Sequence, residues 1–310
     1  MWRYDDSRAA LRDALRLSRA MTYKSAVAGL SLGGGKGVIM LRGELTPERR
    51  DDALRDFGDT VEMLGGAYVT AEDVGTSTRD MELIAGQTSH VSGLARERGG
   101  SGDPSPFTAL GVVTAIEVAC ERAFGSADVA GRSVAVVGLG HVGEHIARTL
   151  AASGASLLVS DIDERKRAIA DELGARWVAP EDALGAEVDV YAPCALGGIL
   201  DHETVARLGA PVVAGAANNQ LADESVADEL RDRGVLWAPD FVANAGGIIN
   251  ISVEVEPGGY DADVAAERVR GIGETLRRIF DDAEERGITP LAAALALAEA
   301  NLAAGEQSRA

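Results

Sequence analysis

The stretch "SVAVVGLGHVGEHIARTL", residues 133–150, constrains the fold more than any other part of the chain. An apolar run ends in a G-x-G-x-x-G pattern, and an amphipathic helical pattern follows it. In such a strand–turn–helix unit the first glycine allows a tight turn and the second lets backbone approach a pyrophosphate. The third permits close packing of helix on sheet. The helix N-terminus then offers N–H donors to phosphate oxygens. The motif alone is weak evidence, but its strand and helix context predicts a dinucleotide site.

The predicted loop set is Gly138, Gly140, His141, Val142 and Gly143. Asp161 ends the next apolar stretch, close to the spacing of about 20 residues at which an acid contacts the ribose. Its carboxylate would accept a hydrogen bond from a 2′-hydroxyl and would repel a 2′-phosphate, so the sequence favours NAD over NADP. Arg165 and Lys166 follow closely and leave use of both cofactors open. The alternative for Asp161 is a helix cap.

From Arg132 onward, short apolar segments alternate with helical ones. Alternation of this kind is typical of a parallel, doubly wound sheet in an α/β protein. The tail, about 262–304, indicates two helices separated near Gly287 and Pro290. The strand candidates are "RSVAVVGLG", "SLLVSD", "EVDVYAP", "APVVAGA" and "GVLWAP".

The first third of the chain does not show this regular alternation of strands and helices. Apolar residues at helical spacing predict a helix over 8–20. Thr46 as N-cap, Pro47 at the first helical position and Gly65 as a stop delimit a second helix. "GGGKGVIML" and "AYVTAED" are strand candidates, and "SPFTALGVVTAIEVACERAFG" begins a long helix towards the next domain.

Lysine is rare in this chain, and two lysines fall within one short stretch. Only three of the 30 basic residues are lysines, and "MTYKSAVAGLSLGGGKGVIM" carries Lys24 and Lys36. A lysine after three glycines lies where little side-chain bulk crowds it and where backbone can approach a ligand. The stretch has no G-x-x-x-x-G-K-[ST] pattern, which argues against a P-loop. The alternative is a solvated lysine beside a turn.

Charge and composition exclude several classes of protein. The net charge is −19 with pI near 4.6, and no basic cluster could neutralise nucleic-acid phosphates or an anionic membrane surface. With no long apolar run and no charged-then-apolar leader, we expect a soluble, cytoplasmic protein. Cys120 and Cys194 are too few for a disulfide framework or a metal site, so no metal is expected.

Eight motifs occur in an order that resembles the Glu/Leu/Phe/Val family of amino-acid dehydrogenases, closest to its leucine and valine branch. They are "MTYK", "GLSLGGGKG", "YVTAEDVGT", "GDPSPFTALGV", "GLGHVG", "YAPCALGG", "GAANNQL" and "APDFVANAGGIIN". The resemblance covers nearly the whole chain. It implies NAD-dependent, reversible oxidative deamination of a small-molecule L-amino acid to a 2-oxo acid and ammonia, by a homo-oligomer.

The resemblance also implies roles for the residues of the opening stretch. Lys24 matches the lysine that holds the substrate carboxylate, and Lys36 matches the lysine that acts as general acid and base. Asp73 matches the carboxylate that handles the substrate amine. Arginine could not replace Lys36, because arginine stays protonated in proteins. To act as a base at neutral pH, Lys36 must be able to lose its proton, so burial and nearby cations must lower its pKa.

Further positions match residues that bind cofactor and substrate. Thr108 and Asn219 would approach the cofactor, and Asn244 would bind substrate near the nicotinamide. Without the resemblance, Thr108 could equally be a helix cap and Asn219 a turn residue. The side-chain pocket matches Ala71, Ile248 and Ile251, which as sequence features alone are more often core residues.

The expected organisation is a substrate-binding domain over 1–107, joined by a returning C-terminal helix over 285–310, and a Rossmann-type NAD domain over 108–284. The apolar pocket residues favour leucine, valine or isoleucine as substrate. A phenylalanine-type dehydrogenase and a truncated, non-catalytic NAD-binding paralogue are the alternatives. Before "MWRYDD", family members usually carry a further segment with a Gly-Gly-Thr-Arg-type stretch, so an N-terminal part of the family pattern is missing from this sequence.

Overall fold

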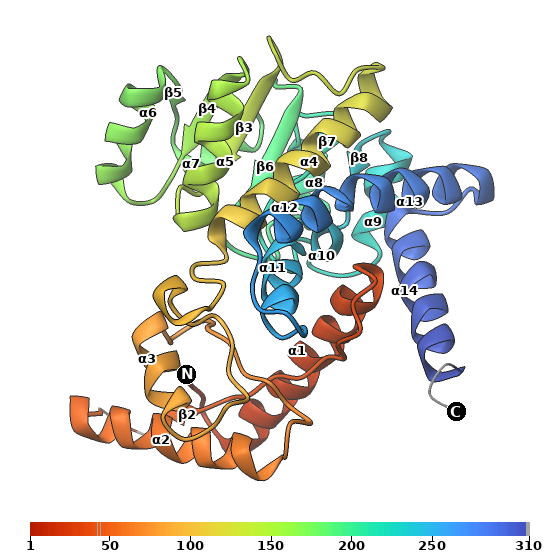
Figure 1. Ribbon diagram of the computed structural model, residues 1–310. Coiled ribbons are helices and arrows are strands. Elements are labelled where there is room, and N and C mark those ends of the chain that lie inside the picture. Colours follow the sequence, from red (N-terminus) through yellow and green to blue (C-terminus); the bar gives the residue numbers. More distant parts are fainter. Residues whose placement is uncertain (42, 44, 308–310) are drawn as a thin grey trace. The chain divides into compact units, whose positions relative to one another are not determined.

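The structure, a computed structural model, describes residues 1–41, 43 and 45–307 (Figure 1). The chain divides into two compact units, each considered by itself below. The first comprises Met1–Pro104 with Ile248–Ala265, and the second comprises Ser105–Gly247 with Ala266–Ala310. This division differs from the expected one at the C-terminus. The segment that joins the first unit is 248–265, whereas residues after 285 cluster with the second unit, where Leu291 packs against the core.

The second unit contains a six-stranded parallel sheet with strand order β5-β4-β3-β6-β7-β8. This is the order of the two βαβαβ halves of a dinucleotide-binding fold, in which the order reverses beside the first strand. The predicted α/β class is therefore confirmed. The strands are β3 (Ser133–Val137), β4 (Ser156–Ser160), β5 (Arg176–Trp177), β6 (Val190–Pro193), β7 (Val212–Val213) and β8 (Leu236–Trp237).

The sheet is buried because helices pack on it. Val134 of β3 pairs with Leu157 of β4 and Val190 of β6, and all three are buried. Parallel strands covered on both faces are continuous apolar runs of this kind. The helices of this unit are α4 (Ser105–Phe124), α5 (His141–Ala152), η2 (Glu164–Lys166), α6 (Arg167–Leu173), α7 (Pro180–Ala183), α8 (His202–Arg207), α9 (Val226–Asp232), α10 (Asp240–Ala243), most of α12 (Ala262–Arg270), α13 (Ile272–Arg286) and α14 (Pro290–Gln307).

The first unit is mainly helical, with a small parallel sheet. Trp2 of β1 pairs with Met40 of β2 in that two-stranded sheet. Its core is a cluster of Leu54, Met81, Ile84 and Val91, with partly buried apolar side chains around it. The elements are β1 (Trp2–Arg3), α1 (Ser7–Val27), β2 (Met40–Leu41), α2 (Pro47–Met63), α3 (Thr78–Ala85), η1 (Arg96–Arg98) and most of α11 (Gly246–Glu254).

Local signals set several boundaries as predicted. Thr46 caps α2 by accepting from the Arg49 N–H at 3.4 Å, Pro47 begins the helix, and Gly65 follows its end with a φ of +57°. Gly287 ends α13 in the left-handed conformation, and α14 begins at Pro290. The tail differs in one respect, because a break at Gly271 makes three helices where two were expected.

Two predictions in the first unit need correction. The helix expected over 8–20 extends to Val27, so Lys24 lies inside α1, and the chain leaves the helix before Gly29 with its φ of +67°. The strand expected in "AYVTAED" is reduced to a single bridge between Thr70 and Val91. A strand needs a partner that offers a ladder of hydrogen bonds, and this segment has the two bonds of that one bridge, from the Thr70 N–H to the His90 carbonyl and from the Ser92 N–H to the Thr70 carbonyl.

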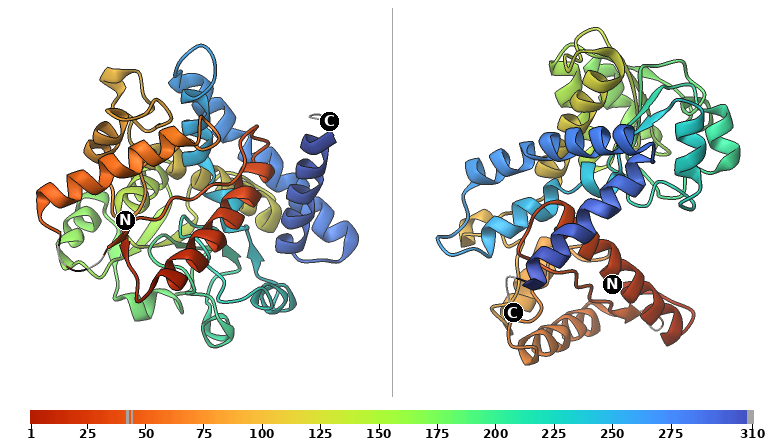
Figure 2. Two further views of the ribbon diagram at one scale, coloured as in Figure 1. Left: turned by 90° about the horizontal axis from the view of Figure 1, so that it is seen from below. Right: turned by 90° about the vertical axis from the view of Figure 1, so that its right-hand side faces the viewer.

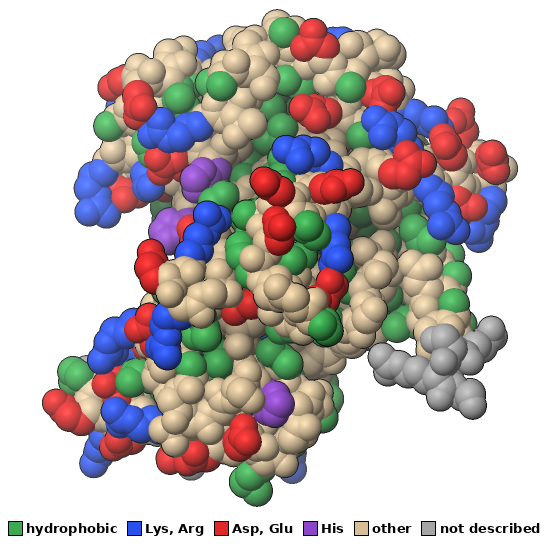
Figure 3. Space-filling model, in the orientation of Figure 1, with side chains coloured by type: hydrophobic (Ala, Val, Ile, Leu, Met, Phe, Trp, Pro, Cys, Tyr) green, Lys and Arg blue, Asp and Glu red, His purple; other side chains and the backbone are tan. Residues whose placement is uncertain are grey.

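Charged side chains of both signs lie next to one another over much of the surface in view (Figure 3). Many are paired: Arg148 of α5, for example, bonds to Glu144 at 3.0 Å and to Glu172 at 2.7 Å. Among the described residues no single helix has the length and apolar composition of a membrane span. The segments Ala262–Arg286 and Pro290–Gly305 meet those criteria only together, and they are bent by 114° (Figure 2).

Candidate active site

Lys36 and Asp73 form an ion pair in the first unit. Lys36 lies in the loop between α1 and β2, and its side chain is 22% exposed. Asp73 lies in the loop before α3, and its side chain is 50% exposed. The structure therefore brings together two residues for which the family resemblance implies proton-transfer chemistry, although 37 positions separate them along the chain.

The glycines beside Lys36 allow its loop to lie directly on other parts of the unit. A Cβ at Gly34 would collide with the backbone N and Oγ1 of Thr22 in α1. A Cβ at Gly35 would lie 2.7 Å from the Tyr68 ring. None of these glycines has a positive φ, so close approach is the reason for them. The approach that the structure shows is to the chain itself.

Tyr68 supports the same loop from its other side. The hydroxyl of Tyr68 accepts a hydrogen bond from the Gly37 N–H at 3.0 Å. A Cβ at Gly37 would lie 2.6 Å from the Phe57 ring of α2. The backbone on both sides of Lys36 is thereby held between α1, α2 and the Tyr68 segment, and its side chain is directed by a supported loop.

The Asp73 loop is held by its own short hydrogen bonds. The Asp73 Oδ1 accepts from the Val74 N–H at 2.7 Å, which leaves Oδ2 for Lys36. The Thr76 hydroxyl donates to the Asp73 carbonyl at 2.6 Å, and Gly75 takes a φ of +80° within the turn. Side-chain and backbone bonds of this type fix a turn ahead of a helix.

Burial lowers the pKa of Lys36, and the carboxylate of Asp13 in α1 partly opposes that shift. Asp13 is itself held ionised, because a 2.6 Å hydrogen bond from the Tyr4 hydroxyl and the guanidinium of Arg16 lower its pKa. Desolvation disfavours a charged ammonium, so more of Lys36 is neutral at a given pH than for a solvated lysine. A neutral amine next to a carboxylate can accept and return protons.

Four of the other predicted substrate residues occupy the same unit, whereas Asn244 belongs to the second one. Lys24 lies in the last turn of α1, two residues after the Thr22 that supports Gly34, and it is half-buried. Ala71 lies two residues before Asp73 and is half-buried. Ile248 and Ile251 lie on α11 and are also half-buried. Their exposure is compatible with pocket positions, and their roles remain predictions.

The G-x-G-x-x-G loop of the second unit joins β3 to α5. Gly138 takes a φ of +102°, and a Cβ there would lie 2.8 Å from Ala195. A Cβ at Gly143 would collide with the Gly138 carbonyl and lie 3.2 Å from the Cys194 Cβ. Gly140, the N-cap of α5, has nothing within 4 Å of its Cβ position. Gly138 and Gly143 therefore have no room for a side chain, whereas Gly140 faces open space at the N-terminus of α5.

Asp161 ties the end of β4 to this loop. Its Oδ2 accepts from the Leu139 N–H at 2.6 Å and its Oδ1 from the Asp163 N–H at 2.8 Å. The helix-cap alternative fits Asp163 instead, which accepts from the Arg165 N–H at the start of η2. Each carboxylate oxygen has a second lone pair, so Asp161 can still accept from a ribose hydroxyl. His141 and Val142 form the first turn of α5.

Three further predicted residues lie in the second unit, one on α4 and two in loops. Thr108 lies in the first turn of α4 and is half-buried. Asn219 is exposed and takes a φ of +52°. Asn244 is 5% exposed, and its Nδ2 donates to the Ala216 carbonyl at 3.1 Å and to the Asn218 Oδ1 at 2.9 Å. The Asn244 Oδ1 has no hydrogen-bond partner among the described residues.

Sequence reasoning missed the buried network that shapes the Asn219 loop. Gln220 is wholly buried, and its Nε2 donates to the Gly215 and Ala217 carbonyls. Its Oε1 accepts from the Trp237 indole at 2.9 Å. An amide in the run "GAANNQL", directly after an apolar strand, was the available signal. Tyr68 and Thr22 were missed because nothing in the sequence shows that glycines pack on them.

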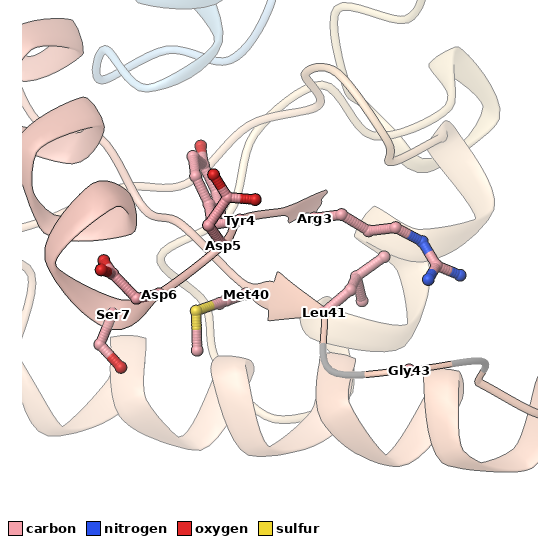
Figure 4. A pocket seen from close by; sticks show the side chains of 8 residues that line it. All are labelled: Arg3, Tyr4, Asp5, Asp6, Ser7, Met40, Leu41 and Gly43. Atoms are coloured by element: carbon pink, nitrogen blue, oxygen red, sulfur yellow. The ribbon is translucent and has the colours of Figure 1, made fainter.

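A cavity of about 570 Å³ lies beside the two-stranded sheet of the first unit (Figure 4). Its lining contains none of the predicted site residues, and it does not include the Lys36–Asp73 pair. We therefore identify the candidate site from the chemistry of the Lys36–Asp73 pair and not from this cavity. Within the described part of the chain, no three His, Cys, Asp or Glu side chains are grouped as metal ligands. The cavity is lined by Arg3, Tyr4, Asp5, Asp6, Ser7, Met40, Leu41 and Gly43.

Comparison with protein families matches both parts of the chain. Residues 2–90 match the Glu/Leu/Phe/Val dehydrogenase dimerisation domain, and residues 158–308 match Glutamate/Leucine/Phenylalanine/Valine dehydrogenase. Residues 114–195, which include the Gly138 loop, match the NAD binding domain of D-isomer specific 2-hydroxyacid dehydrogenases.

Individual relatives extend this similarity over the whole chain. The chain is 43% identical to leucine dehydrogenase of Bacillus subtilis (strain 168), over 100% of this chain and 84% of the relative. It is 43% identical to valine dehydrogenase of Streptomyces virginiae, over 96% and 83% of the two chains. The crystal structure of L-tryptophan dehydrogenase from Nostoc punctiforme matches with a TM-score of 0.84 and 40% identity, covering 98% and 87%. This chain belongs to the Glu/Leu/Phe/Val dehydrogenase family.

Proposed function

We propose that this chain is an NAD-dependent L-amino-acid dehydrogenase that acts on branched-chain substrates. A branched-chain L-amino acid, NAD⁺ and water give the 2-oxo acid, ammonium, NADH and a proton, and the reaction is reversible. The observation that carries the proposal is the ion pair between half-buried Lys36 and Asp73, in a chain that matches leucine dehydrogenases over its full length.

NAD fits the Gly138 loop for three structural reasons. The open space at the Gly140 Cβ position lets the backbone approach a pyrophosphate, and the α5 N-terminus offers N–H donors to it. Asp161 lies beside the loop through its bond to Leu139, where it can accept from the adenosine ribose. NAD supplies the acceptor for the hydride that leaves the substrate Cα.

The first unit would hold and process the amino acid. Lys24 would pair with the substrate carboxylate as a point charge. Asp73 would accept a proton from the substrate amine, since the amine must be neutral before the Cα hydride leaves. Neutral Lys36 would then take a proton from a water molecule as its oxygen bonds to the iminium carbon. The ammonium of Lys36 would return that proton to the amine, the C–N bond would break as ammonia leaves, and neutral Lys36 would take the hydroxyl proton as the carbonyl of the 2-oxo acid forms.

The choice of substrate would depend on Ala71, Ile248 and Ile251. All three are apolar and half-buried. A glutamate side chain would bring a carboxylate among them, and a buried, unpaired charge is strongly unfavourable. A branched aliphatic side chain would bury apolar surface there at about 25 cal/mol per Å². We therefore expect leucine, valine and isoleucine to be preferred over glutamate.

An aromatic substrate is the second candidate, and a specific comparison favours it. The chain is 43% identical to L-tryptophan dehydrogenase of Nostoc punctiforme (strain ATCC 29133 / PCC 73102), over 99% of this chain and 85% of the relative. That identity equals the identity to leucine dehydrogenase of Bacillus subtilis. The small side chain of Ala71 would leave room for a ring.

The test is to follow NADH formation with leucine, valine, isoleucine, phenylalanine, tryptophan and glutamate as substrates. The branched-chain proposal expects the highest kcat/KM with one of the aliphatic substrates. A higher kcat/KM for tryptophan or phenylalanine would establish the second candidate. Faster turnover of glutamate would refute the pocket assignment, and NADH formation with none of the six would refute the proposed function.

We also propose that the chain forms a homo-oligomer through its first unit. Leu11 is 60% exposed and Leu15 is 64% exposed, and their spacing puts them on one face of α1. Both lie in the segment that matches the family's dimerisation domain. Replacing both by Asp should lower the mass measured by analytical ultracentrifugation. A monomeric wild type, or a double variant of unchanged mass, would contradict this interface.

A cytoplasmic location is proposed from the two cysteines. Both are free, and burial raises the pKa of Cys120 to about 11 and that of Cys194 to about 12. Unreactive thiols of this kind need no oxidising compartment. Fractionation of the source cells tests the location, and recovery of the enzyme outside the cytoplasmic fraction would refute it.

A further inference from the structure

Glu254, the last residue of α11, accepts two backbone hydrogen bonds from one distant loop. One of its carboxylate oxygens accepts from the Gly93 N–H at 2.9 Å and from the Ser101 N–H at 2.8 Å. Gly93 and Ser101 are both buried, so water does not replace these partners freely. None of the chemical steps proposed above uses Glu254. Its two bonds span more than 150 residues of sequence, since the loop lies 161 and 153 positions away.

The loop that Glu254 holds is itself attached to the segment that carries Asp73. The Ser92 N–H donates to the Thr70 carbonyl at 2.8 Å, and the Thr70 N–H donates to the His90 carbonyl at 3.0 Å. A Cβ at Gly93 would lie 3.9 Å from the Glu72 backbone N. The backbone on which Glu254 acts therefore lies directly beside residues 70–73.

At its other end, the connection made by Glu254 leads to α11, the helix that carries two of the predicted pocket residues. Ile248 and Ile251 lie on α11, which ends at Glu254. Asn250 lies four residues before Glu254 and so on the same face of the helix. Asn250 is wholly buried, and its Oδ1 accepts from the Tyr260 hydroxyl at 2.7 Å. This part of α11 is thus attached at two points on one face.

A charged acceptor is the strongest partner that a pair of backbone N–H groups can have. Hydrogen bonds to an ionised carboxylate are shorter and about twice as strong as neutral ones. Removing the carboxylate would leave two buried N–H groups without partners, which favours movement of the loop towards water. The distance between α11 and residues 70–73 would then no longer be fixed.

We propose that Glu254 is a positioning residue that sets the amino-acid selectivity of this enzyme. By holding the Gly93–Ser101 loop to the end of α11, it keeps Ile248 and Ile251 in a fixed place relative to Ala71 and Asp73. The selectivity part of this proposal rests on the proposed function, whereas the structural connection does not. Every residue in the connection belongs to the first unit.

The test compares Glu254→Ala and Glu254→Gln with the control Glu97→Gln. Glu97 is exposed, lies in the same loop, and makes no side-chain hydrogen bond among the described residues. Amide hydrogen exchange of peptides covering 91–102 should be faster in Glu254→Ala and unchanged in the control. Glu254→Gln keeps an oxygen acceptor without the charge, so its exchange should be intermediate. That variant also keeps the test valid if Glu254→Ala does not fold.

Kinetics then separate a positioning role from a purely structural one. In Glu254→Ala we expect KM for the preferred branched-chain substrate to rise by about tenfold or more, and the leucine-to-valine ratio of kcat/KM to move from its wild-type value towards one. KM for NAD should stay within about twofold, because the Gly138 loop belongs to the other unit. Glu254→Gln should recover most of the selectivity.

Each result decides one part of the proposal. Unchanged exchange in both Glu254 variants would show that the connection does not hold the loop. Faster exchange with unchanged KM and selectivity would refute the positioning role. If the wild type does not reduce NAD with any of the amino acids tested, the proposed function and the selectivity role are refuted together. Exchange needs no turnover, so it would still decide whether Glu254 holds the loop.

Discussion

Alanine at Gly34 should damage this protein, whereas alanine at its neighbour Gly33 should not. A Cβ at Gly34 would occupy the space of the Thr22 backbone N and Oγ1 and of the Ser18 carbonyl. Two of these three atoms belong to the backbone of α1 and cannot rotate away. At Gly33 the Cβ would meet nothing within 4 Å, and Gly33 does not have a positive φ.

The magnitudes follow from these two environments. Overpacking of the kind expected at Gly34 costs about 1–3 kcal/mol of unfolding free energy. At Gly33 the substitution restricts the unfolded chain without strain, which stabilises by about 0.4–1 kcal/mol. The two variants should therefore differ by roughly 1.5–4 kcal/mol. Lys36 lies two residues after Gly34, so turnover should also fall in Gly34→Ala and persist in Gly33→Ala.

Urea unfolding of the two variants and the wild type measures the difference directly, with NADH formation as the second readout. The midpoint should move to lower urea for Gly34→Ala and stay level or rise for Gly33→Ala. Equal midpoints for the two variants would refute the packing of Gly34 on α1. A strong loss for Gly33→Ala would mean that this loop is crowded where the structure shows open space.

Three other predictions concern charge. Lys36→Arg should lower kcat by about a hundredfold or more, since arginine cannot supply a neutral base. Lys24→Arg should mainly raise KM for the amino acid. If stopped-flow and steady-state kinetics show equal effects of the two substitutions, the division of roles is wrong. Asp161→Ser should remove a preference for NAD over NADP of about tenfold or more, and calorimetric titration of wild type and variant with both cofactors checks this. Burial opposes ionisation of Asp80, but the Arg50 guanidinium and Ser77 hold its pKa below the usual 3.8. The ionised carboxylate therefore stabilises the folded state above about pH 4, and this contribution is lost as pH falls through the lowered pKa. Asp80→Asn should therefore cost about 3 kcal/mol at neutral pH, with the gap to wild type closing in acid, and a gap in urea midpoints that stays constant down to pH 3 would be evidence against the pair.

The parts of the molecule read correctly from sequence are those with a local cause. The glycine spacing, the apolar strands from Arg132 onward and the caps at Thr46 and Gly287 each act within a few residues. The parallel, doubly wound sheet follows from the same alternation, because right-handed crossovers leave few other topologies, whereas the strand order β5-β4-β3-β6-β7-β8 came from the structure. Eight ordered motifs also indicated the family, and the comparisons confirmed it.

Contacts between distant residues were decided only by the tertiary structure. The sequence placed Lys36 after three glycines, but nothing in it shows that Gly34 packs on Thr22 or that Tyr68 accepts from Gly37. Nor does it show that segment 248–265 joins the first unit, or that Glu254 bonds to the Gly93–Ser101 loop. The physical reason is that helix and turn signals arise from neighbouring residues, whereas packing and long-range hydrogen bonds depend on which surfaces the folded chain brings together.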